Sequence, residues 1–317
     1  MDLVKELKNA KTIGITGHVR PDGDCVGAVI SMYLLARKIC PEAEIVPMIE
    51  SVPEEYLFLE GTQAVRSDFN PGIEEFDIFI GLDSSTTDRY GEAEKFFLSA
   101  GKTIVIDHHE TNEGFGDVRL IDGNVGSSCE LIYSVIPKKY MDIEIAQALY
   151  VGIISDTGVL QYSCTSPETM RIVASLMEYG FDFSDIIEKT FYEKTRRQNE
   201  ILGRALMESI IFMDGKCIVA KVDKKTMDFY GADSHDLDGI ATQLRYTKGV
   251  EVSIFMHEIE PMVYKISLRS KGLVDVAKIA KFYNGGGHKR AAGFTMNGTF
   301  HDCVNNISDS IAMQLEK

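Results

Sequence analysis

The sequence predicts an α/β protein in which a mostly parallel sheet with helices on both faces is joined by a helical linker to a smaller α/β domain. Three observations support this fold class. Short apolar runs alternate with amphipathic stretches through the first half of the chain, which is the pattern of a parallel sheet with crossover helices. A charged helical section follows, and further strand and helix patterns occupy the remaining residues. The length of 317 residues also exceeds the usual size of one domain.

The first domain is predicted over residues 1–185, where strands and helices are expected to alternate along the chain. Apolar runs predict buried strands, and the stretches between and after them carry helical patterns. The expected strands are 12–16, 44–49, 76–82 and 102–106, and the expected helices are 25–39, 127–136 and 143–154. Ligands of such folds bind beyond the carboxyl ends of the strands, so polar residues at these ends are the first candidates for a functional site.

The remaining residues are predicted to form the linker, 186–213, and the smaller domain, 214–317. The linker is expected to be helical because residues 193–200 are highly charged and suit a solvated helix. The smaller domain is expected to have strands at 216–222, 250–257 and 262–268 and helices at 236–246, 274–282 and 302–315.

Composition and charge exclude several classes of protein. The apolar stretches are much shorter than the roughly 20 residues that cross a membrane, and the N-terminus lacks the features of a signal peptide. We therefore expect a cytoplasmic protein without a membrane span. The six cysteines show no CxxC spacing, which argues against a disulfide framework or a cysteine zinc site. The net charge of −15 argues against a long nucleic acid ligand, whereas a short phosphorylated ligand is compatible with it.

The first polar cluster directly follows the strand expected at 12–16 and contains His18, Asp22 and Asp24. A loop with this spacing can direct three ligands into a small volume, because Pro21 and Gly23 supply the turn. The alternative is a structural turn in which Asp24 caps the next helix.

Three more clusters end predicted strands or helices. Asp83 follows the strand expected at 76–82, where capping of the next helix is an equal alternative. Residues 107–110 are four consecutive ionisable residues, Asp-His-His-Glu, which cannot all be buried without partners. Asp156 ends an apolar helix, where the helix dipole disfavours an acid and a nearby cation would explain it better than a merely polar helix end.

These clusters together predict a site for two divalent metal ions. Each cluster alone has a structural alternative, but chance agreement of all six residues with a single site is much less probable than any one of these alternatives suggests. Mixed carboxylate and imidazole ligands suit manganese first and magnesium second, rather than calcium or a structural zinc ion. The predicted metal ligands are His18, Asp22, Asp24, Asp83, His108 and Asp156.

The four motifs resemble those of the DHH phosphoesterases, a family named for the triplet that stands here at 107–109. Residues 284–293 resemble the glycine-rich signature of the DHH-associated C-terminal domain, so the resemblance covers nearly the whole chain. From the residues alone, the glycine run predicts either an anion-binding backbone or a flexible loop. The chain departs from the family at Cys25 and Val26 and at residues 159–161, and neither departure removes a ligand.

The resemblance implies roles for individual residues. One metal would be held by His18, Asp22 and Asp83, and the other by Asp24, Asp83, His108 and Asp156, with Asp83 as the bridge. The implied catalytic residues are Asp83, His109, which would contact the substrate phosphate, and Asp107, which would orient the histidines. The implied substrate-binding residues are Arg269, Gly285, Gly286, Gly287 and His288. The Arg269 assignment has an ordinary strand-end arginine as its alternative.

The resemblance is strongest to the nanoRNase subgroup, which implies an active site in the cleft between the domains. The implied reaction is attack by a hydroxide, activated by two metals, on short oligoribonucleotides (nanoRNA) or on the 3′-phosphate of pAp. A cyclic or linear dinucleotide phosphodiesterase is the alternative, followed by an inorganic pyrophosphatase and by a catalytically silent nucleotide-binding protein. The substrate partner is thus expected to be short RNA or a small nucleotide, and a homodimer is compatible with the sequence.

Overall fold

The computed structural model describes residues 1–315, and the chain divides into two compact units, Met1–Glu193 and Lys194–Lys317. The division falls inside the predicted linker, and the predicted domain limits at 185 and 214 stay predictions. Glu316 and Lys317, which end the predicted second domain, lie outside the described residues. Along the described part of the chain, no helix combines the length and apolar character that crossing a membrane requires.

The first unit is built on a parallel sheet of five strands in the order β2-β1-β3-β4-β5. The four predicted strands are present, which confirms the predicted fold class, and β5 was not predicted. Since β5 is a partly exposed edge strand, it lacks the continuous apolar run of a buried one. The strands are β1 (Thr12–Thr16), β2 (Glu44–Met48), β3 (Ile78–Leu82), β4 (Thr103–Asp107) and β5 (Val118–Ile121).

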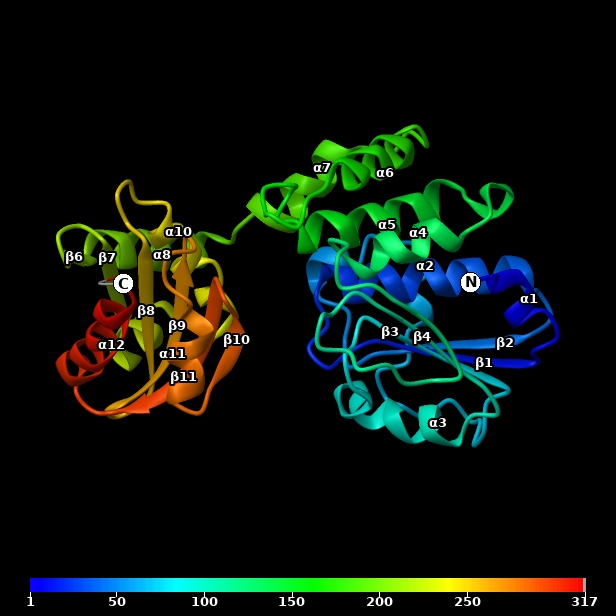
Figure 1. The fold of residues 1–317 in the computed structure, drawn as a ribbon, viewed down its shortest axis with the longest axis horizontal. Coiled ribbons are helices and arrows are strands. Elements are labelled where there is room, and N and C mark those ends of the chain that lie inside the picture. Colours follow the sequence, from blue (N-terminus) through cyan, green and yellow to red (C-terminus); the bar gives the residue numbers. More distant parts are fainter. Residues whose placement is uncertain (316–317) are drawn as a thin grey trace. The chain divides into compact units, whose positions relative to one another are not determined.

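Helices cover both faces of this sheet, as Figure 1 shows. On one face lie α2 (Gly23–Ile39), α4 (Ser128–Val135) and α5 (Ile143–Asp156), which pack on the isoleucines of β1, β3 and β4. The other face carries an aromatic cluster that includes residues of α3 (Glu94–Ser99). The remaining helices of this unit are α1 (Leu3–Leu7), α6 (Pro167–Met177) and α7 (Phe183–Ile187), with short 3₁₀ turns at 54–56, 62–64, 87–93 and 138–140.

Helices α2 and α5 approach each other closely because glycines face each other across the contact. A Cβ atom on Gly27 would lie 2.4 Å from the backbone oxygen of Ala148 and 3.0 Å from the backbone nitrogen of Gly152. Real Cβ atoms do not occupy such positions, so the pair of glycines permits this helix contact. The contact brings the start of α2 close to the end of α5, and both ends carry predicted metal ligands.

The predicted linker is not one continuous helix, which corrects the expectation from its charge. Helix α7 runs into a π-helical turn at Glu188–Tyr192, and the backbone is then extended at Glu193. A new helix, α8 (Arg196–Met207), begins at a capping box made by Thr195 and Gln198. The apolar face of α8 is buried in the core of the second unit through Ile201 and Ala205. Tertiary packing therefore gives this segment a fixed place in the second unit.

The second unit contains a mixed sheet of six strands in the order β10-β11-β9-β8-β7-β6, in which β7 and β8 are parallel and the other pairs antiparallel. One face packs on α11 and α12, and the other on α8, α9 and α10. The strands are β6 (Ile210–Phe212), β7 (Cys217–Val222), β8 (Val252–Glu260), β9 (Val263–Ser270), β10 (Gly286–His288) and β11 (Ala291–Asn297). The other helices are α9 (Lys224–Tyr230), α10 (Ile240–Arg245), α11 (Val276–Phe282) and α12 (Phe300–Leu315), with a 3₁₀ turn at His235–Leu237.

Candidate metal centre

The loop between β1 and α2 positions the first three predicted ligands. Asp22 is the N-cap of α2, and its Oδ1 atom accepts hydrogen bonds from the backbone nitrogens of Asp24 and Cys25, both at 3.1 Å. The alternative for this loop was a structural turn in which Asp24 caps the next helix. A cap is present, but the capping residue is Asp22, and Asp24 lies inside the helix. The His18 Nε2 atom is 3.7 Å from Asp22 Oδ1, so the capping carboxylate also faces the imidazole.

Asp83 lies at the end of β3 and stands between the histidines of two different loops. Its Oδ2 atom is 3.4 Å from His18 Nε2, and its Oδ1 atom is 3.5 Å from His108 Nε2. The residue is 2% exposed and adopts a φ of +53°, a left-handed conformation that non-glycine residues rarely take. The N-cap of the following helical turn is Thr86, so capping does not account for Asp83.

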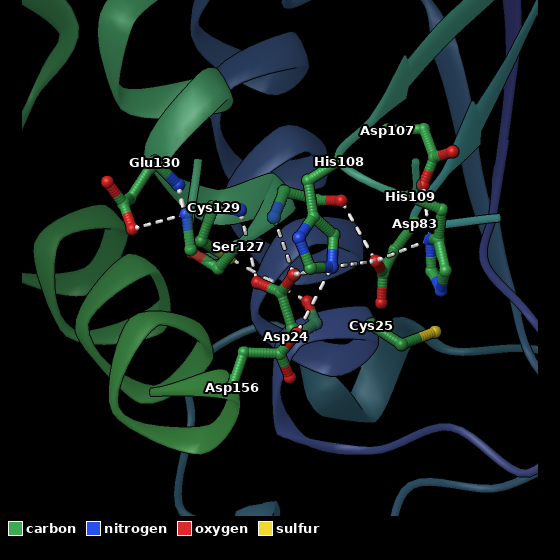
Figure 2. Close-up of polar contacts among 12 residues, drawn as sticks. Asp24, Cys25, Asp83, Asp107, His108, His109, Ser127, Cys129, Glu130 and Asp156 are labelled. Carbon is green, nitrogen blue, oxygen red and sulfur yellow. Dashed lines mark hydrogen bonds and ion pairs between the residues drawn. The ribbon is translucent and has the colours of Figure 1, made fainter. Parts of the chain in front are cut away.

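His108 gathers the other carboxylates of the site. Its Nε2 atom lies 3.1 Å from Asp156 Oδ2 and 3.9 Å from Asp24 Oδ2. Asp156 is the last residue of α5, and Asp24 belongs to the first turn of α2. Figure 2 shows the side chains of Asp24, Asp83 and Asp156 turned toward the His108 ring. All six predicted ligands therefore meet in one cluster at the carboxyl end of the sheet.

Asp107 and His109 form a hydrogen-bonded pair beside this cluster. The His109 Nδ1 atom is 2.7 Å from Asp107 Oδ1, and the Asn112 side-chain amide donates to Asp107 Oδ2 at 2.7 Å. Asp107 is fully buried, His108 and His109 are partly buried, and Glu110 is exposed, so the three residues that are withdrawn from solvent are those with polar partners. The two partners fix the Asp107 carboxylate, which in turn fixes the plane of the His109 ring.

The protonation of the cluster reflects its crowding with carboxylates. Burial acts to lower the pKa of His18, but Asp22 and Asp83 raise it to about 10. Burial likewise acts to lower the pKa of His108, but neighbouring carboxylates, Asp156 first among them, raise it to about 10. Burial and repulsion from neighbouring carboxylates raise the pKa of Asp156 to about 6 and hold that of Asp24 well above its ordinary range. Added positive charge, supplied by protons or by metal ions, therefore stabilises the cluster.

The donors fit divalent cations in both chemistry and spacing. Ligand atoms lie within 4.8 Å of one another in the group Asp24, His108 and Asp156, and also in the group Asp83, His108 and His109. A third group consists of His18, Asp83 and the buried thiol of Cys25, whose pKa burial raises well above its ordinary value. Carboxylate and imidazole donors suit manganese and related ions. Cys25 is not one of the six ligands predicted from the sequence.

The predicted substrate-binding residues belong to the second unit. Arg269 lies on β9 opposite Ala291 of β11, and its Nη1 atom donates to the backbone oxygen of Leu268. The glycine run is not a flexible loop, because residues 286–288 form β10 and pair with residues 291–293 of β11. His288 is exposed at the end of β10.

The three glycines have different surroundings. A Cβ atom on Gly285 would lie 2.3 Å from the backbone oxygen of Gly293, and one on Gly287 would lie 2.5 Å from that of Ala291. Packing against β11 therefore explains two of the glycines. Among residues 1–315, apart from its two chain neighbours, a Cβ atom on Gly286 would meet no atom within 4 Å, so packing does not explain this glycine.

Sequence reasoning did not identify Asn112, Ser128 or the backbone of Cys129 as parts of the site. Asn112 holds Asp107, and the first turn of α4 donates hydrogen bonds to Asp24 and Asp83. A signal was present, because Ser127 and Glu130 have the S-x-x-E spacing of a helix start. That spacing gives no indication that the helix start faces Asp24 and Asp83.

The sheet topology and the cluster define an α/β protein with a carboxylate and imidazole site of the kind that holds divalent metal ions. Comparison with known proteins agrees. Residues 12–153 match the DHH family, N-terminal domain, and residues 214–317 match the DHHA1 domain. The chain therefore belongs to the DHH phosphoesterase family, whose members are hydrolases acting on phosphoester bonds.

Individual relatives align over nearly the whole chain. The bifunctional oligoribonuclease and PAP phosphatase NrnA of Thermus thermophilus is 29% identical over 303 residues, which cover 94% of this chain and 89% of the relative. The protein of the same name from Bacillus subtilis is 24% identical, with coverage of 92% and 91%. The crystal structure of an exopolyphosphatase-related protein from Bacteroides fragilis superposes with a TM-score of 0.89 at 25% identity, covering 98% of this chain and 94% of that one.

Proposed function

We propose that this protein is a manganese-dependent phosphoesterase that hydrolyses short oligoribonucleotides to mononucleotides and removes the 3′-phosphate of pAp. The observation that carries the proposal is the position of Asp83. Its two carboxylate oxygens face the imidazoles of His18 and His108 at 3.4 and 3.5 Å, so one carboxylate can serve two metal ions. The NrnA relatives, named as oligoribonucleases and PAP phosphatases, support the choice of substrate.

The proposed ligands divide into two sets that share Asp83. His18, Asp22 and Asp83 would hold one divalent ion, and the second would be held by Asp24, Asp83, His108 and Asp156. Bound in this way, the two ions would supply an activated water and neutralise charge on the reacting phosphate. Without cations the buried carboxylates of Asp24 and Asp156 are repelled by neighbouring carboxylates, and bound divalent ions would neutralise that repulsion.

His109 is proposed to contact the phosphoryl group of the substrate. Its Nδ1 atom is engaged by Asp107, which leaves Nε2 to meet a phosphoryl oxygen, and Nε2 donates a hydrogen bond to that oxygen when both ring nitrogens carry a proton. Asn112 holds the other oxygen of Asp107, which keeps the ring in one plane. Asp107 thus acts through His109 and does not need to reach the substrate.

The second unit is proposed to bind the rest of the nucleotide through Arg269, His288 and the glycine run, in which the Cβ position of Gly286 is open space. Charge supports this division of roles. Residues 1–193 contain 15 lysine and arginine against 33 aspartate and glutamate residues, whereas residues 194–317 contain 18 against 15. An anionic substrate is therefore attracted by the second unit and repelled by the first, except where metal ions compensate the carboxylates.

An assay of manganese-dependent hydrolysis tests the proposal. Its substrates are pAp, ribonucleotides of two to five residues, cyclic dinucleotides and pyrophosphate. We expect turnover of pAp and the short ribonucleotides, and loss of that turnover in Asp83→Ala. Asp88→Ala is the matched control, since Asp88 is an exposed carboxylate in the 3₁₀ turn at 87–93 that follows Asp83. Substantial activity in Asp83→Ala would refute the site, and turnover of pyrophosphate or cyclic dinucleotides alone would refute the substrate.

A further inference from the structure

The first turn of helix α4 holds Asp24, a fully buried carboxylate of the metal centre. The backbone nitrogen of Ser128 donates to Asp24 Oδ2 at 2.6 Å, and the backbone nitrogen of Cys129 donates to Asp24 Oδ1 at 3.1 Å. Backbone N–H groups in the first turn of a helix have no partner within the helix and point along a favourable dipole. Both oxygens of Asp24 are therefore anchored, each with a lone pair remaining for a cation.

Ser128 also contacts Asp83, a second buried carboxylate of the proposed metal centre. The hydroxyl of Ser128 donates to Asp83 Oδ1 at 2.9 Å, and Ser128 is fully buried. This bond engages the oxygen that faces His108 and leaves Oδ2 directed toward His18. Rotation of the Asp83 carboxylate about its Cβ–Cγ bond would break the bond, so the hydroxyl selects the orientation in which one oxygen faces each histidine.

We propose that Ser128 is a positioning residue of the metal centre, whose hydroxyl orients Asp83 for its bridging role. The inference rests on the proposed function, in which Asp83 is the ligand shared by two metal ions. Ser128 does not itself ligate a metal or touch the substrate. It acts by reducing the number of carboxylate orientations that metal binding has to select, in the way that outer-shell hydrogen bonds tune ligands in other metal sites.

The neighbouring residue offers a matched control. Ser127 is also fully buried, and its hydroxyl accepts a hydrogen bond from the backbone nitrogen of Glu130 as the N-cap of α4. Each serine thus contributes one hydroxyl to the same helix start, but only that of Ser128 reaches a proposed metal ligand. Removal of the Ser127 hydroxyl affects the helix, whereas removal of the Ser128 hydroxyl affects the carboxylate.

The test is the affinity of the full chain for Mn²⁺, measured by the electron paramagnetic resonance signal of the free ion. We expect Ser128→Ala to weaken manganese binding by about tenfold, the lower end of the usual effect of losing an outer-shell partner. Ser128→Thr keeps the hydroxyl and should restore affinity. Ser127→Ala should bind manganese like the wild type while its melting temperature in EDTA falls.

The outcomes separate this inference from the proposed function. Wild-type affinity in Ser128→Ala overturns it, as does equal weakening in Ser127→Ala, because the helix start as a whole would then be responsible. A wild-type chain that takes up no manganese refutes the proposed function and this inference together. The first two outcomes are measured against a wild type that does bind the metal, so they leave the proposed function standing.

Discussion

Replacement of Gly152 by alanine should damage both the stability and the metal affinity of the first unit. Gly152 lies on α5, where a Cβ atom would be 2.2 Å from Cys129 Sγ and 2.7 Å from Asp24 Oδ1. Both atoms are fully buried, and Asp24 is anchored by two backbone nitrogens, so neither can yield without breaking a contact. The added methyl group must therefore displace the start of α4 or the carboxylate.

Two opposing terms set the expected size of the effect. Alanine in place of glycine within a helix favours folding by up to about 1 kcal/mol. Overpacking of a buried site disfavours folding by about 1–3 kcal/mol. Because two atoms would approach within 3.0 Å, we place Gly152→Ala in the upper part of that range, which gives a net loss of about 1–2 kcal/mol.

The assay is chemical unfolding in EDTA together with manganese binding to the folded protein. Gly203→Ala is the matched control, because Gly203 lies on helix α8 and a Cβ atom there would meet no other described atom within 4 Å. That variant should gain up to about 1 kcal/mol with unchanged manganese affinity. Adding Cys129→Ala to Gly152→Ala should restore part of the stability, since it removes the nearer contact. Unfolding of Gly152→Ala at wild-type stability with wild-type affinity would refute the reasoning.

Three further predictions concern the second unit and the metal. Glu251→Ala should lower stability by about 2–3 kcal/mol, because one buried oxygen of Glu251 accepts three backbone hydrogen bonds; thermal unfolding should show Glu251→Gln in between, and equal stability of both variants would contradict this. Burial and then Lys265 lower the pKa of His257, so the contribution of His257 to stability should fall as pH drops through 6.5, the unfolded value, toward the folded pKa; the difference in melting temperature between the wild type and His257→Gln should change over this range, the difference for the exposed His301→Gln should stay constant, and a constant difference for His257→Gln would contradict the prediction. Manganese at 100 times its dissociation constant should stabilise the chain by about 2.7 kcal/mol per site, and an identical melting temperature in EDTA would count against a metal centre.

The sequence predicted the central strands of the first sheet because burial on both faces forces a continuous apolar run. β5 could not be predicted in this way, since an edge strand has one open side and tolerates the exposed Arg119. The strands β10 and β11 were missed for another reason. Glycine and alanine at 286–287 and 291–293 carry no strand preference of their own, and the pairing comes from close backbone contact.

The residues proposed as metal ligands could be selected one by one from the sequence because each stands near the point where a strand or helix begins or ends. The supporting residues were not, because their role depends on the path of the chain between distant elements. Ser128 is 45 residues from Asp83 and 104 from Asp24 in sequence, so no local pattern links them. Asp22 and Asp24 show the same limit, since spacing alone could not decide which of the two caps α2 and which is buried.

The distribution of charge changes the argument about substrate length. The net charge of −15 favoured a short ligand, but it is the sum of an acidic first unit and a second unit with 18 basic against 15 acidic residues. Repulsion of a long polyanion therefore operates only over the first unit, and the second unit gives no electrostatic reason to reject one. On the proposed function, the cations bound at the metal centre attract a phosphate within this acidic unit. A chain of many phosphates would place the rest of its charge against that acidic unit, whereas a substrate of a few nucleotides brings fewer charges to it.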